Sequence, residues 1–172
     1  KLCTDRIISP KYLYGGMGDG GGCHPRDNIA LSYLARKLNL SYNWYDNIMK
    51  QREKQTEWLA DMIMTEKFEM DINILGKCFK PETNLTLGSP SLLLKNILEE
   101  RGERVKIWDP YVDSVDMKEV SYEMEWETKP QLFFIGTKHE AFKHFYFFPN
   151  SVVIDPFRYL KLGNGIRYIP IG

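Results

Sequence analysis

The sequence predicts an α/β protein in which a short helical segment, residues 1–68, precedes a parallel-sheet domain, residues 69–172. Between residues 28 and 63, apolar side chains recur at the three-to-four-residue period of a helix, after a loop rich in glycine and proline. After Phe68, short β-prone runs alternate with helical stretches, which is typical of a parallel sheet whose strands are joined by crossover helices. The change of pattern places the boundary between the two parts near residues 66–69.

The helical segment is expected to begin with a loop and to continue with two helices. Residues 9–27 contain six glycines and two prolines, a composition that argues against a helix or a central strand. An apolar stripe then predicts a helix from Asn28 to Leu38, and a second stripe predicts another helix over residues 44–63.

The second part shows strand and helix signals in alternation. Strands are expected at residues 70–75, 105–108, 131–135 and 152–154. Ser89 and Pro90 are a typical N-cap and first residue of a helix, which we expect to end at Gly102. A shorter helix is expected near residues 140–144, and the acidic segment 113–128 is expected to form a short helix with a solvated face.

Composition and charge argue against several classes of protein. The chain has 172 residues with 23 Lys plus Arg and 23 Asp plus Glu, so it lacks the basic excess of a nonspecific nucleic-acid-binding protein. No apolar run approaches the ~20 residues that a membrane-spanning helix needs. Cys3, Cys23 and Cys78 are too widely spaced for a disulfide framework, which suits a reducing compartment. We therefore expect a cytoplasmic protein with neither nucleic acid nor a membrane as its partner.

Cys23 is the strongest catalytic candidate, because it lies between the glycine-rich loop and the expected start of a helix. Free N–H groups at a helix N-terminus, together with Arg26 and His24, would favour the nucleophilic thiolate. Asp27, four residues further on, could position a water or a proton, and the glycines would let a substrate approach backbone N–H donors. The alternative is a small buried cysteine beside a helix-capping aspartate, and this segment alone is equally compatible with it.

The loop after the first expected strand, residues 76–88, is the second candidate site. Ligands of open α/β sheets bind at the carboxyl ends of strands, and helix N-termini bind anions. Lys80 in this loop and Arg158 after the fourth expected strand are therefore candidates for contacting a phosphate or a sugar. The alternatives are a solvated loop lysine and a surface ion pair, respectively.

No metal site is expected from the spacing of potential ligands. Cys23 and His24 are adjacent instead of spaced around one ion. His139 and His144 lack a cysteine or a pair of carboxylates at a recognised spacing.

Taken together, these segments resemble the UDP-glucose/GDP-mannose dehydrogenase family of NAD-dependent nucleotide-sugar dehydrogenases. The matching segments occur in the family's order along the whole chain. They are residues 5–7 and 18–27 (the family's DRIG and GFGGSCFPKD), 74–90 (LGLAFKPxT…SP), 108–111 (DPY), 137–142 (TxHxxF) and 154–158 (D-x-R). The cysteine motif is the most specific of them.

The resemblance implies an enzyme of three parts: an N-terminal NAD-binding domain, a central helical dimerisation domain and a C-terminal Rossmann-like domain that binds the nucleotide-sugar. Residues 1–68 are expected to be the end of the central domain and residues 69–172 the C-terminal domain. NAD would then be bound mainly by a domain outside this chain, which alone is expected to be inactive. A homodimer or a higher homo-oligomer is implied as well.

In this family the C6 alcohol of the sugar is oxidised twice by NAD, through a cysteine thiohemiacetal and a thioester, and water releases the uronic acid. By the match, Cys23 is the nucleophile and Asp27 its acid–base partner. The residues that the resemblance places on the nucleotide-sugar are Arg6 (across a dimer), Tyr14, Met17, Gly18, Gly20, Gly21, Phe79, Lys80 and Arg158.

Two departures from the family pattern leave the base, the sugar and the cofactor contacts open. Asp19 stands where the family often has an aromatic or aliphatic residue, and Leu87 replaces an arginine that many members use towards NAD. Two other hypotheses are kept: a stand-alone nucleotide-sugar-binding or dimerisation module without dehydrogenase activity, and a cysteine-dependent acyltransferase or hydrolase that pairs Cys23 with His24 or His139.

Overall fold

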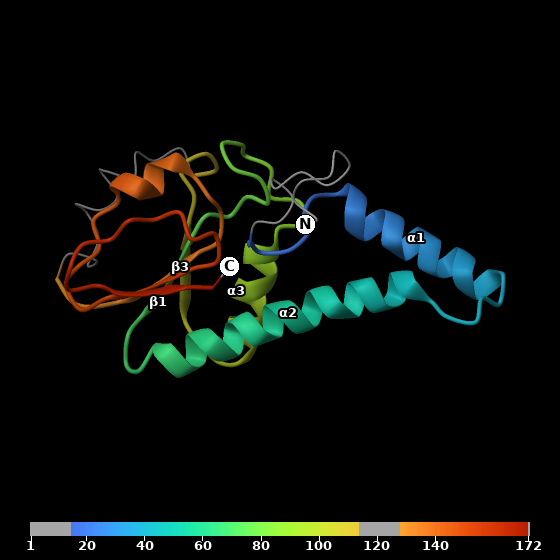
Figure 1. Cartoon of the computed structure of the whole chain (residues 1–172), viewed down its shortest axis with the longest axis horizontal. Helices are drawn as coiled ribbons and strands as arrows, with labels where there is room; N and C mark the ends of the chain where they lie inside the picture. Colours follow the sequence, from blue (N-terminus) through green and yellow to red (C-terminus); the bar gives the residue numbers. More distant parts are fainter. Residues whose placement is uncertain (1–14, 114–127, 172) are drawn as a thin grey trace, which may run out of the picture.

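The computed structural model describes residues 15–113 and 128–171. Its helices are α1 (Cys23–Lys37), α2 (Trp44–Glu66), α3 (Pro90–Glu100) and the 3-10 helix η4 (Glu140–His144). Its strands are β1 (Ile72–Leu75), β2 (Val105–Trp108), β3 (Leu132–Ile135), β4 (Val152–Asp155) and β5 (Arg167–Pro170). Figure 1 shows a hairpin of α1 and α2 beside a sheet domain, so the predicted α/β class and the order of its parts are confirmed.

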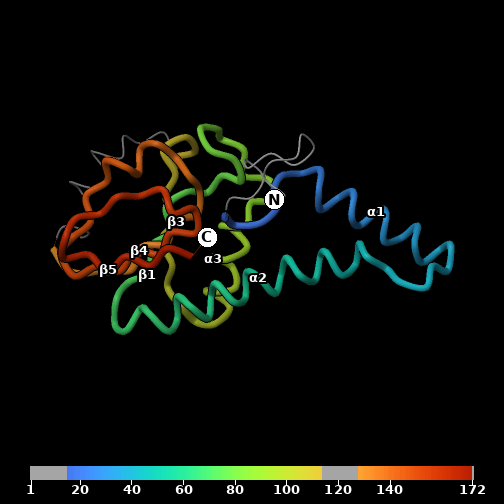
Figure 2. The backbone as a smooth tube through the Cα atoms, in the orientation of Figure 1, coloured from blue at the N-terminus to red at the C-terminus, as the bar shows by residue number. Residues whose placement is uncertain are grey.

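The strands form one parallel sheet in the order β2-β1-β3-β4-β5. Every residue of the central strands β1, β3 and β4 is buried, as expected for a parallel sheet that is covered on both faces. The edge strand β5, visible in Figure 2, was not predicted. Its residues are exposed or half-buried and it ends in a proline, so it lacks the apolar run that marks the central strands.

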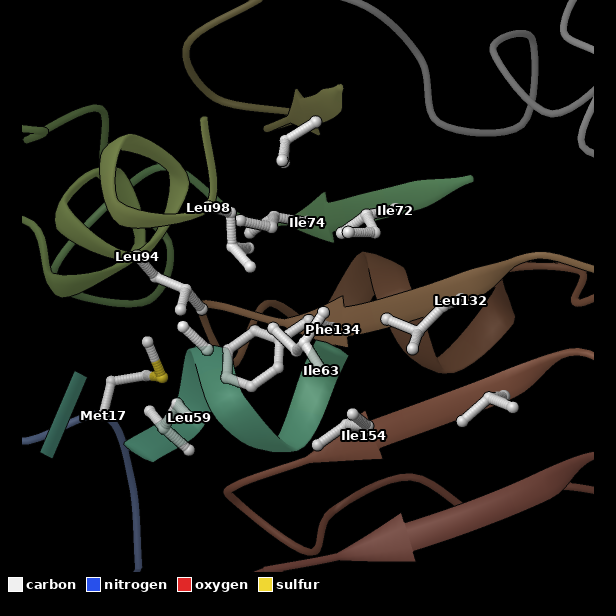
Figure 3. Close-up of a cluster of buried hydrophobic side chains, with 13 residues drawn as sticks. Met17, Leu59, Ile63, Ile72, Ile74, Leu94, Leu98, Leu132, Phe134 and Ile154 are labelled. Atoms are coloured by element: carbon white, nitrogen blue, oxygen red, sulfur yellow. The ribbon is translucent and has the colours of Figure 1, made fainter. Parts of the chain in front are cut away.

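The two faces of the sheet support separate apolar clusters. Helices α2 and α3 cover one face, where Ile63 and Leu98 pack against Ile74 and Phe134 (Figure 3). The opposite face is covered by η4 and the segment after it, which place the rings of Phe145 and Phe147 against Phe133 and add Phe142 to the same cluster. Because each cluster takes alternate residues of the same strands, the sheet is held between two apolar layers.

Most helix boundaries follow the predicted signals. Ser89 accepts a hydrogen bond from the backbone N–H of Ser91 (3.2 Å) and Pro90 is the first residue of α3, so the predicted start is confirmed. Helix α1, however, begins at Cys23, five residues before the predicted start at Asn28. Its first turn contains a proline, which a helix tolerates there because the first N–H groups have no partner within the helix. The predicted short helix in segment 113–128 lies almost wholly outside the described residues.

The hairpin of α1 and α2 leaves many apolar side chains exposed. In α1 only Ser32 and Ala35 are buried. The exposed apolar residues of the hairpin include Ile29, Leu31, Tyr33, Leu34, Leu38, Leu40, Tyr42 and Trp44. Within the described residues, no helix is both long enough and apolar enough to cross a membrane. An apolar surface of this kind is typical of an interface with another protein.

Candidate functional site

The glycine loop, residues 15–22, lies between the carboxyl edge of the sheet and the start of α1. Met17 is 7% exposed and belongs to the same apolar cluster as Leu59 of α2, beside which Figure 3 shows it. Gly18 and Gly21 have φ values of +86°, a backbone conformation that residues with a Cβ atom rarely adopt. Met17 therefore anchors the loop in the core, and the residues on either side of Asp19 have no side chain beyond hydrogen.

The β1–α3 loop, residues 76–88, packs directly on the glycine loop. A Cβ atom at Gly20 would lie 2.7 Å from the Cβ of Phe79, and one at Gly21 would lie 3.0 Å from its ring. At Gly88 an added Cβ would lie 2.5 Å from the carbonyl oxygen of Gly21. Only glycine permits this approach, so the Phe79 ring is held against the backbone of the glycine loop.

A cavity of about 380 Å³ opens where these loops meet the sheet. Its walls come from the glycine loop, the β1–α3 loop, the start of α3 and the segments that follow β3 and β4. The residues that define it best are Gly16, Met17, Gly18, Phe79, Thr137 and Phe157. The cavity thus lies at the carboxyl ends of the strands, which is where ligands of open α/β sheets bind.

Cys23 and Asp27 follow the glycine loop in the sequence, but they do not line the cavity. Cys23 is exposed, and it is the first residue of α1 after the N-cap Gly22. Asp27, one turn further along α1, is exposed and pairs with Arg26 at 3.3 Å. The structure therefore places the Cys23 thiol at an accessible helix N-terminus.

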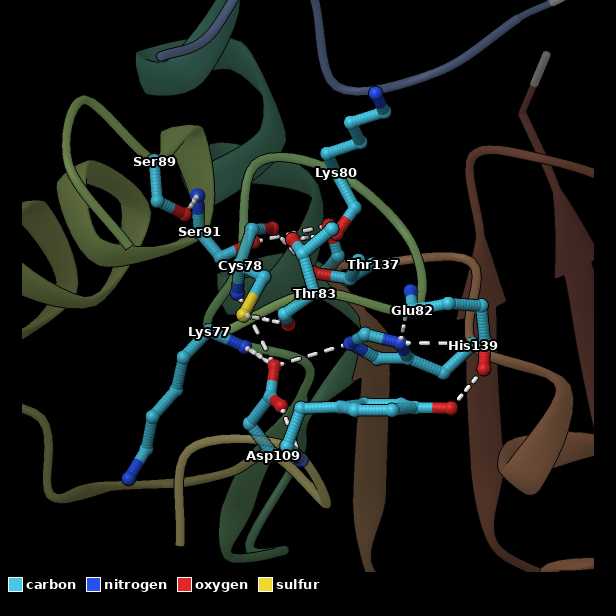
Figure 4. A network of polar contacts seen from close by, with 12 residues as sticks. Lys77, Cys78, Lys80, Glu82, Thr83, Ser89, Ser91, Asp109, Thr137 and His139 are labelled. Carbon is cyan, nitrogen blue, oxygen red and sulfur yellow. Dashed lines mark hydrogen bonds and ion pairs between the residues drawn. The ribbon is translucent and has the colours of Figure 1, made fainter. Parts of the chain in front are cut away.

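Of the other predicted site residues, the structure brings Met17, Gly18 and Phe79 together in the cavity wall. Gly20 and Gly21 contact Phe79 from behind. Lys80 and Arg158 are exposed and do not line the cavity, although each adjoins a residue that does. In Figure 4 the Lys80 side chain points away from the buried polar network. Arg6 and Tyr14 lie outside the described residues.

A buried polar network supports the β1–α3 loop from below (Figure 4). The Oδ2 atom of Asp109 accepts hydrogen bonds from the backbone N–H groups of Lys77 (2.7 Å) and Cys78 (3.1 Å), and lies 3.1 Å from Nε2 of His139. The backbone N–H of Glu82 donates to Nδ1 of His139 (3.0 Å), so Nε2 carries the proton. Burial opposes ionisation of Asp109, but the hydrogen bonds from His139 and Lys77 hold its pKa below the usual range.

The thiol of Cys78 is part of this network. Burial, with the neighbouring Asp109 carboxylate, raises the pKa of Cys78 to about 12, so the thiol keeps its proton at neutral pH. The Sγ atom lies 2.9 Å from the carbonyl oxygen of Thr83, to which it donates. Cys78 is therefore a structural residue and not a nucleophile.

Cys78, Asp109 and His139 place their potential ligand atoms within 4.8 Å of one another, close enough to surround a metal ion. Spacing in the sequence did not indicate this group, because its members come from three separate loops. Each of the three ligand atoms already has a hydrogen-bond partner. These three residues can therefore connect their loops through hydrogen bonds alone, without a metal ion.

Sequence reasoning placed Arg158 near the site but did not predict Thr137, after β3, or Phe157, after β4, in its wall. Thr137 and Phe157 line the cavity. The turn that presents Phe157 is organised by the buried carboxylate of Asp155, which accepts hydrogen bonds from the backbone N–H groups of Phe157 (2.9 Å), Tyr159 (2.9 Å) and Leu160 (3.1 Å). Their place at strand ends was the available signal, since parallel pairing brings those ends together.

Comparison with known proteins finds two matching family models. The model of the UDP-glucose/GDP-mannose dehydrogenase family, UDP binding domain, matches residues 73–161. The model of the family's central domain matches residues 1–54. The two matches follow the order of the helical segment and the sheet domain.

Curated relatives carry the same family name. UDP-glucose 6-dehydrogenase TuaD of Bacillus subtilis (strain 168) is 32% identical over 109 residues, covering 62% of this chain and 24% of the relative. UDP-glucose 6-dehydrogenase of Gallus gallus is 31% identical over 115 residues, covering 63% of this chain and 23% of the relative. The chain thus matches about a quarter of the length of these relatives.

Solved structures share the fold. A UDP-glucose dehydrogenase from Pyrobaculum islandicum superposes with a TM-score of 0.78 at 21% identity, over 99% of this chain and 41% of that one. A GDP-mannose dehydrogenase from Pseudomonas aeruginosa gives 0.70 at 20% identity, over 97% of this chain and 43% of that one. The predicted Rossmann-like fold is thereby confirmed. Because the match of the UDP-binding domain alone covers more than half of its residues, the chain belongs to the UDP-glucose/GDP-mannose dehydrogenase family.

Proposed function

We propose that this chain forms the nucleotide-sugar site of an NAD-dependent nucleotide-sugar 6-dehydrogenase and carries its cysteine nucleophile. The observation that supports this most directly is the cavity at the carboxyl ends of β3 and β4, closed by the glycine loop and the β1–α3 loop. In this proposal residues 1–68 belong to the central domain, and residues 69–172 bind a UDP- or GDP-sugar.

The cavity has features that suit the nucleoside diphosphate group of a UDP- or GDP-sugar. Pro90 at its wall is the first residue of α3, so the positive end of that helix dipole lies at the cavity, where it would favour an anion. Phe79 offers an apolar surface, and the exposed Lys80 and Arg158 bring positive charge to the rim. Arg6 and Tyr14 would complete the site from outside the described residues.

The role proposed for Cys23 is supported by its exposure at the N-terminus of α1, the end of a helix that favours negative charge. Its thiolate would add to the C6 aldehyde, forming a carbon–sulfur bond, and Asp27 would move the protons. NAD would accept a hydride in each of the two oxidations, and the second oxidation would turn the adduct on Cys23 into a thioester. Water then cleaves the thioester and returns the thiol.

The hairpin of α1 and α2 is proposed as the surface of a homodimer. Its exposed apolar side chains include Ile29 at 61% and Tyr33 at 67% exposure. Burial of such side chains against a second copy would remove their cost of exposure to water.

Calorimetric titration of the chain with UDP-glucose, UDP-N-acetyl sugars and GDP-mannose tests the proposal. We expect one of these ligands to bind with saturation and NAD alone to give no heat. A folded chain that binds none of the nucleotide-sugars would contradict the proposed site.

Replacement of Lys80 by Ala removes a positive charge from the rim of the cavity. Hydrogen bonds to charged groups contribute about 1.5–3 kcal/mol, so we expect the Kd for the nucleotide-sugar to rise roughly tenfold or more. Calorimetry measures this, with Lys37→Ala at the far end of α1 as the control. An unchanged Kd would remove Lys80 from the site.

Replacement of Cys23 by Ser is expected to abolish net formation of the acid while the affinity for the nucleotide-sugar stays the same. The hydroxyl is a weaker nucleophile and a poorer leaving group than the thiolate. The measurement needs the longest natural form of the protein that contains this chain, with NAD. The adjacent variant His24→Ala is the control and should still form acid. Acid formation by Cys23→Ser at the unsubstituted rate would contradict the nucleophile, and its loss in His24→Ala would favour a cysteine–histidine hydrolase.

Replacement of Tyr33 by Glu places a charge in the proposed dimer surface. We expect the chain to sediment as a dimer and the Tyr33→Glu variant to sediment largely as a monomer in analytical ultracentrifugation. Tyr146→Glu, at an exposed position of the sheet domain, is the control. A chain that is monomeric at every concentration would overturn the dimer.

A further inference from the structure

Arg52 joins three segments that are distant in sequence. Its Nη2 donates to the carbonyl oxygen of Gly88 (3.0 Å), and its Nε donates to the carbonyl oxygen of Asp19 (3.4 Å). The same Nε lies 3.5 Å from Oδ1 of Asp19. The side chain is only 14% exposed, so solvent screens these contacts less than those of a surface ion pair. One guanidinium thus links α2 to the glycine loop and to the β1–α3 loop.

The glycine loop runs along one face of α2, and Arg52 is the last residue of α2 that contacts it in the direction of the helix N-terminus. Met17 packs in the same cluster as Leu59, and a Cβ atom at Gly18 would lie 3.2 Å from Oε1 of Gln55. Residues 52, 55 and 59 of α2 lie on one side of the helix, because three- and four-residue steps return to the same face. Successive loop residues therefore meet successive turns of α2.

Helix α2 is a firm support for these contacts. Thr56, Leu59, Ala60 and Ile63 are all buried, which fixes the helix against the sheet. The hydroxyl of Thr56 donates to the carbonyl oxygen of Arg52 (3.0 Å). Arg52 therefore projects from a part of the helix whose position the core determines.

Both loops that Arg52 holds are walls of the cavity, yet Arg52 itself does not line it. Gly88 already approaches the carbonyl oxygen of Gly21 closely, so a small shift of either loop would change how Phe79 covers the glycine backbone. A planar guanidinium can bond two carbonyl oxygens and a carboxylate at once, which an ammonium group cannot do in the same geometry.

We propose that Arg52 is a positioning residue that holds the glycine loop and the β1–α3 loop in register, so that the nucleotide-sugar site is formed before the ligand arrives. The inference rests on the proposed function and extends it to a residue that lies outside the wall of the cavity. The ion pair with Asp19 fixes which part of the glycine loop Arg52 contacts.

The experiment compares Arg52→Ala and Arg52→Lys with the unsubstituted chain. Lys54→Ala is the matched control, because Lys54 is a cation on the same helix whose ion pair with Glu57 (2.9 Å) involves neither loop. Each variant is first shown to be folded by circular dichroism and thermal melting. Two measurements follow: hydrogen exchange without ligand, and calorimetric titration with the nucleotide-sugar that the unsubstituted chain binds.

Hydrogen exchange measures how firmly the β1–α3 loop, one of the two loops that Arg52 contacts, is held without ligand. The probes are the backbone amides of Phe79, bonded to Leu85 (3.1 Å), and Ser89, bonded to Thr86 (3.0 Å). We expect Arg52→Ala to accelerate their exchange about tenfold, the effect of a lost charged hydrogen bond, while the amides of β1 and β3 keep their rates. Lys54→Ala should change neither. Equal rates at both loop amides in a folded Arg52→Ala chain would overturn the proposal, whether or not any ligand binds.

Titration then links the register to the site. We expect Arg52→Ala to raise the Kd roughly tenfold and Arg52→Lys to recover part of the affinity, because a lysine keeps the pair with Asp19 and one carbonyl contact. A purely structural role would lower the melting temperature without this partial rescue. If the unsubstituted chain binds and Arg52→Ala binds equally well, the positioning role is wrong and the proposed function stands. If the unsubstituted chain binds nothing, the proposed function fails, and loop exchange alone decides whether Arg52 holds the register.

Discussion

The carboxylate of Asp109 is the interaction on which the rest of the candidate site depends. It lies at the carboxyl end of β2, and one of its oxygens gathers the backbone N–H groups of Lys77 and Cys78 and the imidazole of His139. A buried charge is tolerated only when hydrogen bonds replace its water. The loops after β1 and β3 must therefore converge on Asp109, and that convergence sets where Phe79 can stand above the sheet.

The two cysteines that the structure describes have opposite environments. Cys78 is buried beside a carboxylate, which raises its pKa to about 12 and leaves it a hydrogen-bond donor. Cys23 is exposed at the N-terminus of α1, without a carboxylate partner of that kind among the contacts of the described residues. Burial and a neighbouring carboxylate thus keep the Cys78 thiol within the polar network, whereas the Cys23 thiol is exposed, as the role proposed for it requires.

Much of the fold was predictable because its signals are local. Ser89 and Pro90 mark the start of α3, and the apolar runs of the central strands mark their burial on both faces. Strand β5 was not predictable in this way, since an edge strand needs pairing on one side only and carries a mixed pattern. The start of α1 at Cys23 was placed too late because its first turn is held by backbone geometry and not by an apolar stripe.

In the candidate site too, features with a local sequence signal could be predicted, and features that depend on contacts between distant residues could not. Glycines that admit a close neighbour, such as Gly21 beneath Phe79, are visible in a sequence as a motif, because no other residue satisfies the steric constraint. The role of Arg52 could not be predicted from the sequence, because its partners Gly88 and Asp19 are distant in the chain and contact it only in the folded structure. In the sequence Asp19 is a departure from the family pattern. In the structure the charge of Asp19 has Arg52 as its partner (3.5 Å), so this departure and Arg52 together add a polar contact between the glycine loop and α2.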